Sequence, residues 1–107
     1  MSDAIERLFQ AVTAQRNGDP SASPTANLFA AGRVKIAKKV VEEAAEVSLA
    51  CMEDDPQEVA SEAADLLYNL MVLLVEAGVR PEDVWTEMAK REAELGIAGK
   101  WPKGNRS

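Results

Sequence analysis

The chain has 107 residues, 47% of them hydrophobic and 28% charged, which is typical of one small globular domain and not of a disordered segment. It contains no histidine and one cysteine, which excludes histidine-based catalytic triads, histidine-ligated zinc and internal disulfides. The net charge of −6 argues against nucleic acid as a partner. Catalysis must therefore use carboxylates, lysines, arginines, hydroxyl groups or a bound cation.

Helical patterns begin close to the N-terminus. Residues 3–16 place apolar side chains at helical spacing and predict the first helix, and a loop is expected over 17–21. Ser23 followed by Pro24 is typical of a capped helix start, so a short helix is expected to run from there to about Gly32.

Two long helices are expected next, over 33–53 and 56–77. Asp55 is a natural cap for the second of them, and Pro56 suits its first turn. The first has one broad apolar arc, made of Val34, Ala37, Val40, Val41, Ala44, Val47, Ser48 and Cys51. Cys51 is interpreted as a core residue because it belongs to this arc.

The second half of the 56–77 helix, residues 66–75, is apolar nearly all round and must be covered on every side. One layer of helices in so short a chain can hardly cover it, so dimerisation through this helix is the simplest expectation. A last helix is expected from about Pro81 to Gly96. The sequence therefore predicts an all-α bundle of four to five helices, assembled as a dimer, with one domain over 1–96 and a basic tail over 97–107.

The same run at 66–75 is too short to span a bilayer, and no signal-peptide pattern precedes the first helix. A lone free thiol fits a reducing compartment. These features predict a soluble, cytoplasmic protein with no membrane partner.

Two pairs of acidic residues share the same helical spacing. Glu43 and Glu46 are three residues apart on one long helix, and Glu62 and Asp65 repeat this spacing on the next. If the helices pack antiparallel through a short turn, the two pairs can face each other. Four carboxylates in one small volume repel unless a divalent cation lies among them, and all-oxygen ligands suit Mg²⁺ or Mn²⁺.

Three lysines, Lys35, Lys38 and Lys39, precede these acids by one to two turns, where they can hold the negative charge of a polyphosphate. The alternative is a solvated helix face with ordinary Lys–Glu pairs four residues apart. Two features argue against this alternative. The lysines precede the glutamates, which is the weaker orientation for such ion pairs. Glu62 and Asp65 also come just before the apolar run at 66–75 on the same helix. Tyr68 is interpreted as half-buried packing, with stacking on a nucleobase as the minor alternative.

The acidic motif, Glu42-Glu43-x-x-Glu46 followed by Glu62-x-x-Asp65, resembles that of the all-α nucleoside triphosphate pyrophosphatase (MazG-like) superfamily. The segments SPTANLF at 23–29, KIAKKVVEEAAEV at 35–47 and EAADLLYNLMVLL at 62–74, with Arg91 in the last helix, narrow the resemblance to the phosphoribosyl-ATP pyrophosphohydrolases of histidine biosynthesis. Asn69 stands where that family usually has histidine.

This resemblance implies an all-α homodimer that hydrolyses phosphoribosyl-ATP, a small-molecule nucleotide, to phosphoribosyl-AMP and pyrophosphate with Mg²⁺. It implies that Glu43, Glu46, Glu62 and Asp65 bind metal and that Lys35, Lys38 and Lys39 face the phosphates. From the arrangement of the site itself, Glu42 and Glu46 are the candidates for orienting the attacking water. Asn69 and Arg91 are the candidates for contact with the substrate. Two alternatives stay open, a house-cleaning pyrophosphatase for other nucleoside triphosphates and a non-catalytic helical dimerisation module.

Overall fold

The computed structural model describes residues 3–95, and within that range the chain forms five α-helices and no strand. The helices are α1 (Asp3–Ala14), α2 (Pro24–Ala31), α3 (Arg33–Met52), α4 (Pro56–Ala77) and α5 (Pro81–Leu95). Every boundary lies within two residues of its predicted position, so the all-α prediction is confirmed. The predicted tail at 97–107 lies outside the described residues.

The helix ends follow local signals in the sequence. The side chain of Ser23 accepts a hydrogen bond from the Ala26 N–H at 3.2 Å and caps α2, and Asp55 caps α4 in the same way through the N–H of Glu58. These bonds satisfy backbone donors that the first turn of a helix leaves unpaired. Gly78 ends α4 in the left-handed conformation, with φ of 75°.

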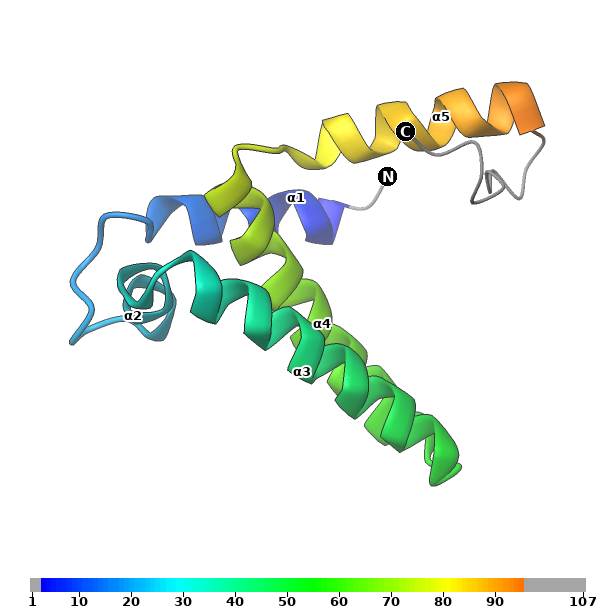
Figure 1. Ribbon diagram of the computed structural model, residues 1–107, viewed down its shortest axis with the longest axis horizontal. Coiled ribbons are helices and arrows are strands. Elements are labelled where there is room, and N and C mark those ends of the chain that lie inside the picture. The colour runs from blue at the N-terminus through cyan, green and yellow to red at the C-terminus, as the bar shows by residue number, and fades with distance from the viewer. Residues whose placement is uncertain (1–2, 96–107) are drawn as a thin grey trace.

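The molecule has two regions of different shape (Figure 1). Residues 41–67, the distal parts of α3 and α4 with the turn between them, form a two-helix projection that we call the arm. Helices α1 and α2 pack around the remaining parts of α3 and α4, and we call this assembly the body. Helix α5 leaves the end of α4 on the far side of the body from the arm.

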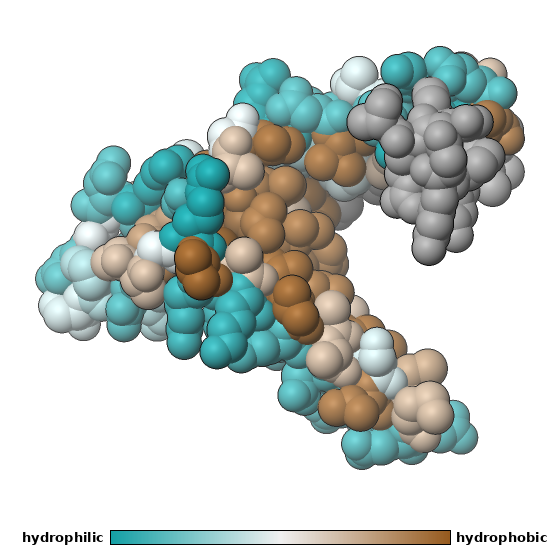
Figure 2. Space-filling model, in the orientation of Figure 1, coloured by the Kyte–Doolittle hydropathy of each residue, from teal (hydrophilic) through white to brown (hydrophobic). Residues whose placement is uncertain are grey.

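The hydrophobic core lies in the body. Its buried residues are Val12, Ile36, Met71, Val72 and Val75. Among the residues of the arm only Ala50 is buried, while Val41 is 70% exposed and Met52 83%. Figure 2 shows apolar surface that continues from the junction of the helices along the arm.

Two arginines anchor the C-terminal end of α4 in the body. Nη1 of Arg16 donates to the carbonyl of Val75 at 2.9 Å, and Nη2 of Arg33 donates to the carbonyl of Glu76 at 3.1 Å. Nε of Arg33 also donates to the Glu76 carboxylate at 3.2 Å. Because the last carbonyls of a helix carry negative partial charge, these cations stabilise that end and tie α3 and the turn after α1 to α4.

The face of α3 that packs on α4 differs from the predicted apolar arc. Burial is greatest along a stripe of residues three or four positions apart, or one helical turn at each step, which runs through Ile36, Val40, Glu43, Val47 and Ala50. Most of the predicted arc points away from α4, and Cys51 is exposed, so its interpretation as a core residue is wrong. The pattern of apolar residues does not predict this stripe, because a charged residue, Glu43, lies in its middle.

No helix among the described residues combines the length and apolarity needed to cross a membrane.

Candidate functional site

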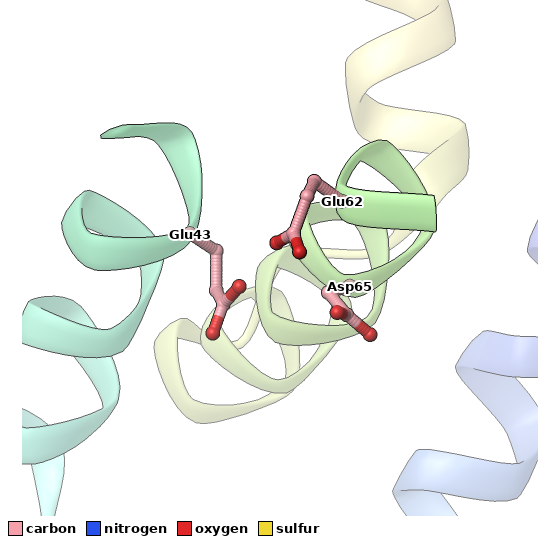
Figure 3. A group of neighbouring side chains, drawn as sticks. All are labelled: Glu43, Glu62 and Asp65. Carbon is pink, nitrogen blue, oxygen red and sulfur yellow. The ribbon is translucent and has the colours of Figure 1, made fainter. Parts of the chain in front are cut away.

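Three carboxylates meet in the gap between the helices of the arm. Glu43 comes from α3, and Glu62 and Asp65 come from α4, and one oxygen of each lies within 4.8 Å of the others. Figure 3 shows Glu43 and Glu62 turned toward each other across the gap, with Asp65 further along α4. We call these three residues the carboxylate cluster.

The packing of the two helices produces this cluster. Glu43 belongs to the stripe of α3 that faces α4, so its side chain is half-buried against the opposite helix. Glu62 and Asp65, three residues apart, lie on one side of α4. The predicted convergence of acids from both helices is therefore present for three of the four residues.

The cluster is electrostatically strained. The pKa of Glu62 is raised above its ordinary value, first because its side chain shares a hydrogen bond with Glu58, then through burial and the negative charges of Glu58, Asp65 and Glu46. The charge of Glu43 is partly balanced by Lys39, whose Nζ lies 3.6 Å from the Glu43 carboxylate. A bound cation would relieve the remaining repulsion between the carboxylates of Glu62 and Asp65.

A cavity of about 450 Å³ opens beside the cluster, and we call it the first cavity. It combines two acids with two lysines and several neutral residues. Its lining is Pro24, Asn27, Leu28, Ala31, Lys35, Lys39, Glu43, Asp65, Tyr68 and Asn69. Such a mixture of carboxylates and ammonium groups suits a metal-bound phosphate chain.

Asn69 is the buried polar residue of this cavity, with 4% of its surface exposed. Its Nδ2 donates to the backbone carbonyl of Asp65 at 2.9 Å, one turn back along α4. Because a carbonyl can only accept, this bond fixes the amide orientation, and Oδ1 becomes the free acceptor. Oδ1 has no hydrogen-bond partner within residues 3–95. A buried acceptor without a donor is costly, which marks Asn69 as a site of interaction with a ligand or an ordered water.

The other predicted site residues lie further from the cluster. Glu46 is exposed and outside the group of three, although its charge contributes to the raised pKa of Glu62. Glu42 and Lys38 are exposed and do not line the first cavity. Arg91 belongs to α5, beyond the body, where its Nε donates to Glu87 at 3.0 Å.

Asn27 lines the first cavity and was not expected there. A single asparagine in a short helix forms no sequence pattern that would distinguish it from an ordinary surface residue. Its role in the cavity wall arises because α2 packs against α3 and α4, which no local pattern predicts.

Comparison with known proteins decides the family. Residues 5–92 match the family model described as phosphoribosyl-ATP pyrophosphohydrolase. The chain belongs to this family. The expected resemblance is thereby confirmed, and the chain is an enzyme, a hydrolase, so the alternative of a non-catalytic helical module does not hold.

Proteins with names of the phosphoribosyl-ATP pyrophosphohydrolase family match nearly the whole chain. A protein of Bradyrhizobium diazoefficiens named phosphoribosyl-ATP pyrophosphatase 2 is 57% identical over 103 residues, which cover 96% of this chain and 77% of that one. A phosphoribosyl-ATP pyrophosphatase of Rhizorhabdus wittichii is 48% identical and is covered over its full length, with 97% of this chain. In Wolinella succinogenes, 42% of a histidine biosynthesis bifunctional protein, HisIE, matches 90% of this chain at 42% identity.

Proposed function

We propose that this chain hydrolyses phosphoribosyl-ATP to phosphoribosyl-AMP and pyrophosphate, the second step of histidine biosynthesis, in the cytoplasm and with Mg²⁺. The observation that carries the proposal is the convergence of Glu43, Glu62 and Asp65 beside a cavity that also presents Lys35 and Lys39. Membership of the family and the names of the relatives support the choice of substrate.

The donor set fits a hard divalent cation. The three carboxylates, with one oxygen of each within 4.8 Å of the others, supply only oxygen, which Mg²⁺ prefers and Mn²⁺ also accepts. A bound cation would polarise the phosphoryl oxygens and bring the phosphate chain to the cluster. Glu46, which lies close enough to act on the charge of Glu62, is proposed as a further ligand.

The lysines are proposed to bind the phosphate chain. Lys35 and Lys39 line the first cavity one turn apart on α3, so both ammonium groups can neutralise charge on the leaving pyrophosphate. Lys38 is exposed on the same helix and is proposed to contribute only a longer-range attraction. Asn69 and Arg91 are proposed to contact the substrate, and Asn69 already lines the cavity.

Hydrolysis needs a water positioned opposite the leaving pyrophosphate. We assign this task to a carboxylate oxygen that does not itself bind the metal, and the candidates are the side chains of Glu46 and Glu42. Glu46 is favoured because its charge acts on Glu62, within the cluster. The water attacks the α-phosphorus, its proton passes to the carboxylate, and the bond to the bridging oxygen of pyrophosphate breaks.

The chain is also proposed to form a homodimer. The arm exposes large apolar side chains, with Val41 at 70%, Leu49 at 57%, Met52 at 83% and Leu67 at 42%, and Val34 at the base of α3 is 83% exposed. A two-helix projection with one buried residue has little to stabilise it alone, and a second copy packed against the exposed face of α3 would cover this surface.

A substrate panel tests the proposed activity. Pyrophosphate release is measured from phosphoribosyl-ATP and from the common ribo- and deoxyribonucleoside triphosphates, with and without Mg²⁺. Phosphoribosyl-ATP is expected to have the highest kcat/KM, and chelation is expected to abolish turnover. Faster hydrolysis of another triphosphate would instead support a house-cleaning enzyme.

A further inference from the structure

A second cavity adjoins the first and is not needed to bind a triphosphate. It has a volume of about 470 Å³ and lies where α1 and the loop before α2 meet the start of α2 and one residue of α4. Pro24 and Tyr68 line both cavities, so they form the partition between them.

A hydrogen bond holds this partition in place. The hydroxyl of Tyr68 and Oγ1 of Thr25 are 2.6 Å apart, and the bond joins the first turn of α2 to α4. Tyr68 is half-buried, so one part of its side chain packs and another remains available at the junction. An aromatic ring between two cavities is suited to contact the middle of a ligand that extends into both.

The second cavity has the chemistry of a sugar site. Leu8 and Val12 supply an apolar floor, and Gln15, Asp19 and Thr25 bring amide, carboxylate and hydroxyl groups. The N–H and hydroxyl of Ser21 donate to Asp19, which lowers the pKa of Asp19 and keeps it an ionised hydrogen-bond acceptor. None of the described residues that line this cavity is basic, so it suits hydroxyl groups and not a phosphate.

Phosphoribosyl-ATP differs from ATP by a second, phosphorylated pentose attached to its purine base. From the two adjoining cavities we infer, on the basis of the proposed function, that the second cavity binds this additional pentose. The base then lies against Tyr68, the triphosphate extends to the carboxylate cluster, and the phosphate of the second pentose points out to solvent. The second cavity is thereby the part of the molecule that distinguishes the substrate from ATP.

The test fills the second cavity and compares two ligands. Ala11 is exposed on α1 and lines the second cavity but not the first, so Ala11→Phe narrows the second cavity without touching the cluster. The KM of phosphoribosyl-ATP is expected to rise about tenfold, because hydrogen bonds to one sugar are lost. The inhibition constant of ATP, which lacks the second pentose, is expected to stay within about twofold. Ala89→Phe, an exposed substitution on α5, is the matched control and is expected to change neither constant.

Each other outcome has a definite meaning. Equal changes in both constants, or a change in neither, overturn the sugar site while leaving the proposed function intact. Failure of the unmodified enzyme to hydrolyse phosphoribosyl-ATP shows instead that the proposed function is wrong, before any variant is made. If Ala11→Phe does not fold, as judged by circular dichroism, Gln15→Ala takes its place, in the turn after α1 and in the wall of the same cavity, with the same two constants measured.

Discussion

The body and the arm contain parts of the same two helices, yet they are held together differently. In the body, α1 and α2 cover the last three turns of α4, and the buried residues Met71, Val72 and Val75 fill the space between them. Among residues 3–95, α3 and α4 pack on each other in the arm, and Ala50 is the one buried residue there. The carboxylate cluster lies in the arm, so the proposed chemistry belongs to the region with the smaller core.

This difference shows how the fold tolerates the cluster. Like charges close together destabilise whichever structure holds them, and a buried core would raise that cost by excluding water. The arm keeps Asp65 exposed and Glu43 and Glu62 only half-buried. The body meanwhile holds the start of α3 and the end of α4, and so sets the register that brings the three acids together.

The largest expected effect is on catalysis in the arm. Asp65→Asn removes one negative charge from the cluster and is expected to lower kcat/KM at least about a hundredfold. The thermal midpoint should hold or rise, since repulsion is relieved and the body is unchanged. Pyrophosphate release and circular dichroism measure the two quantities. Glu94→Gln, a similar change on exposed α5, is the control, and normal turnover in Asp65→Asn would remove this residue from the mechanism.

The comparison of the arm with the body also shows which features of the fold the sequence could predict. Caps at Ser23, Asp55 and Gly78 are local, so the helices appear where expected. The face of α3 that packs on α4 is not local. Apolar residues such as Val41 predict a buried face, but within one chain they are exposed, while Glu43 lies in the packed stripe.

Glu43 and Glu46 show the same limit within the site. Their spacing suggests two equivalent ligands, but a helix turns by about 100° per residue, so only Glu43 is aligned with the buried stripe. The orphaned Oδ1 of Asn69 and the cavity contact of Asn27 depend on the packing of separate helices, and no pattern in one segment contains that information.

The exposed face of α3 provides the next test, since it asks whether the arm is completed by a second copy. Val41→Glu places a charge in the centre of this face and is expected to weaken dimerisation about a hundredfold or more. Light scattering across a concentration series measures the shift to monomer. Gln57→Glu, an added charge near the arm's turn, should leave assembly unchanged. A monomeric unmodified protein, or a Val41→Glu dimer as tight as the original, would contradict the proposed assembly.

Within the body, the joint between α2 and α3 is expected to matter more for stability than for chemistry. Gly32 has φ of 100° and ψ of 170°, a conformation nearly restricted to glycine, so Gly32→Ala is expected to cost about 1–3 kcal/mol of unfolding free energy. Urea titration measures this loss. Gly78→Ala, in the milder left-handed conformation, should cost about 1–2 kcal/mol. A Gly32→Ala protein as stable as the original would show that this joint adjusts freely.

Asn69 lies where the two regions meet and separates structural from catalytic effects. Asn69→Leu keeps the branching of the side chain at Cγ and removes the unpaired acceptor, so stability is expected to stay level or rise. If the missing donor comes from the ligand, kcat/KM should fall about tenfold. Urea titration and pyrophosphate release are compared on the same preparation, and a loss of stability with normal turnover would make Asn69 a purely structural residue.

The smallest expected effect is a pH dependence confined to the arm. Because the pKa of Glu62 is raised in the folded protein, the folded state holds more protons than the unfolded state from pH 4.5 up to the raised value. The stabilising contribution of protonated Glu62 is therefore complete below pH 4.5 and is lost as pH rises through the folded pKa. Metal-free protein should show this decline in thermal midpoint, and Glu62→Gln, which cannot ionise, should show less of it. Added Mg²⁺ should offset this decline in thermal midpoint only when Glu62 is present, because the cation balances the negative charge of the ionised cluster. Identical pH profiles for the two proteins would mean that the acids in the arm do not repel one another enough to need a cation.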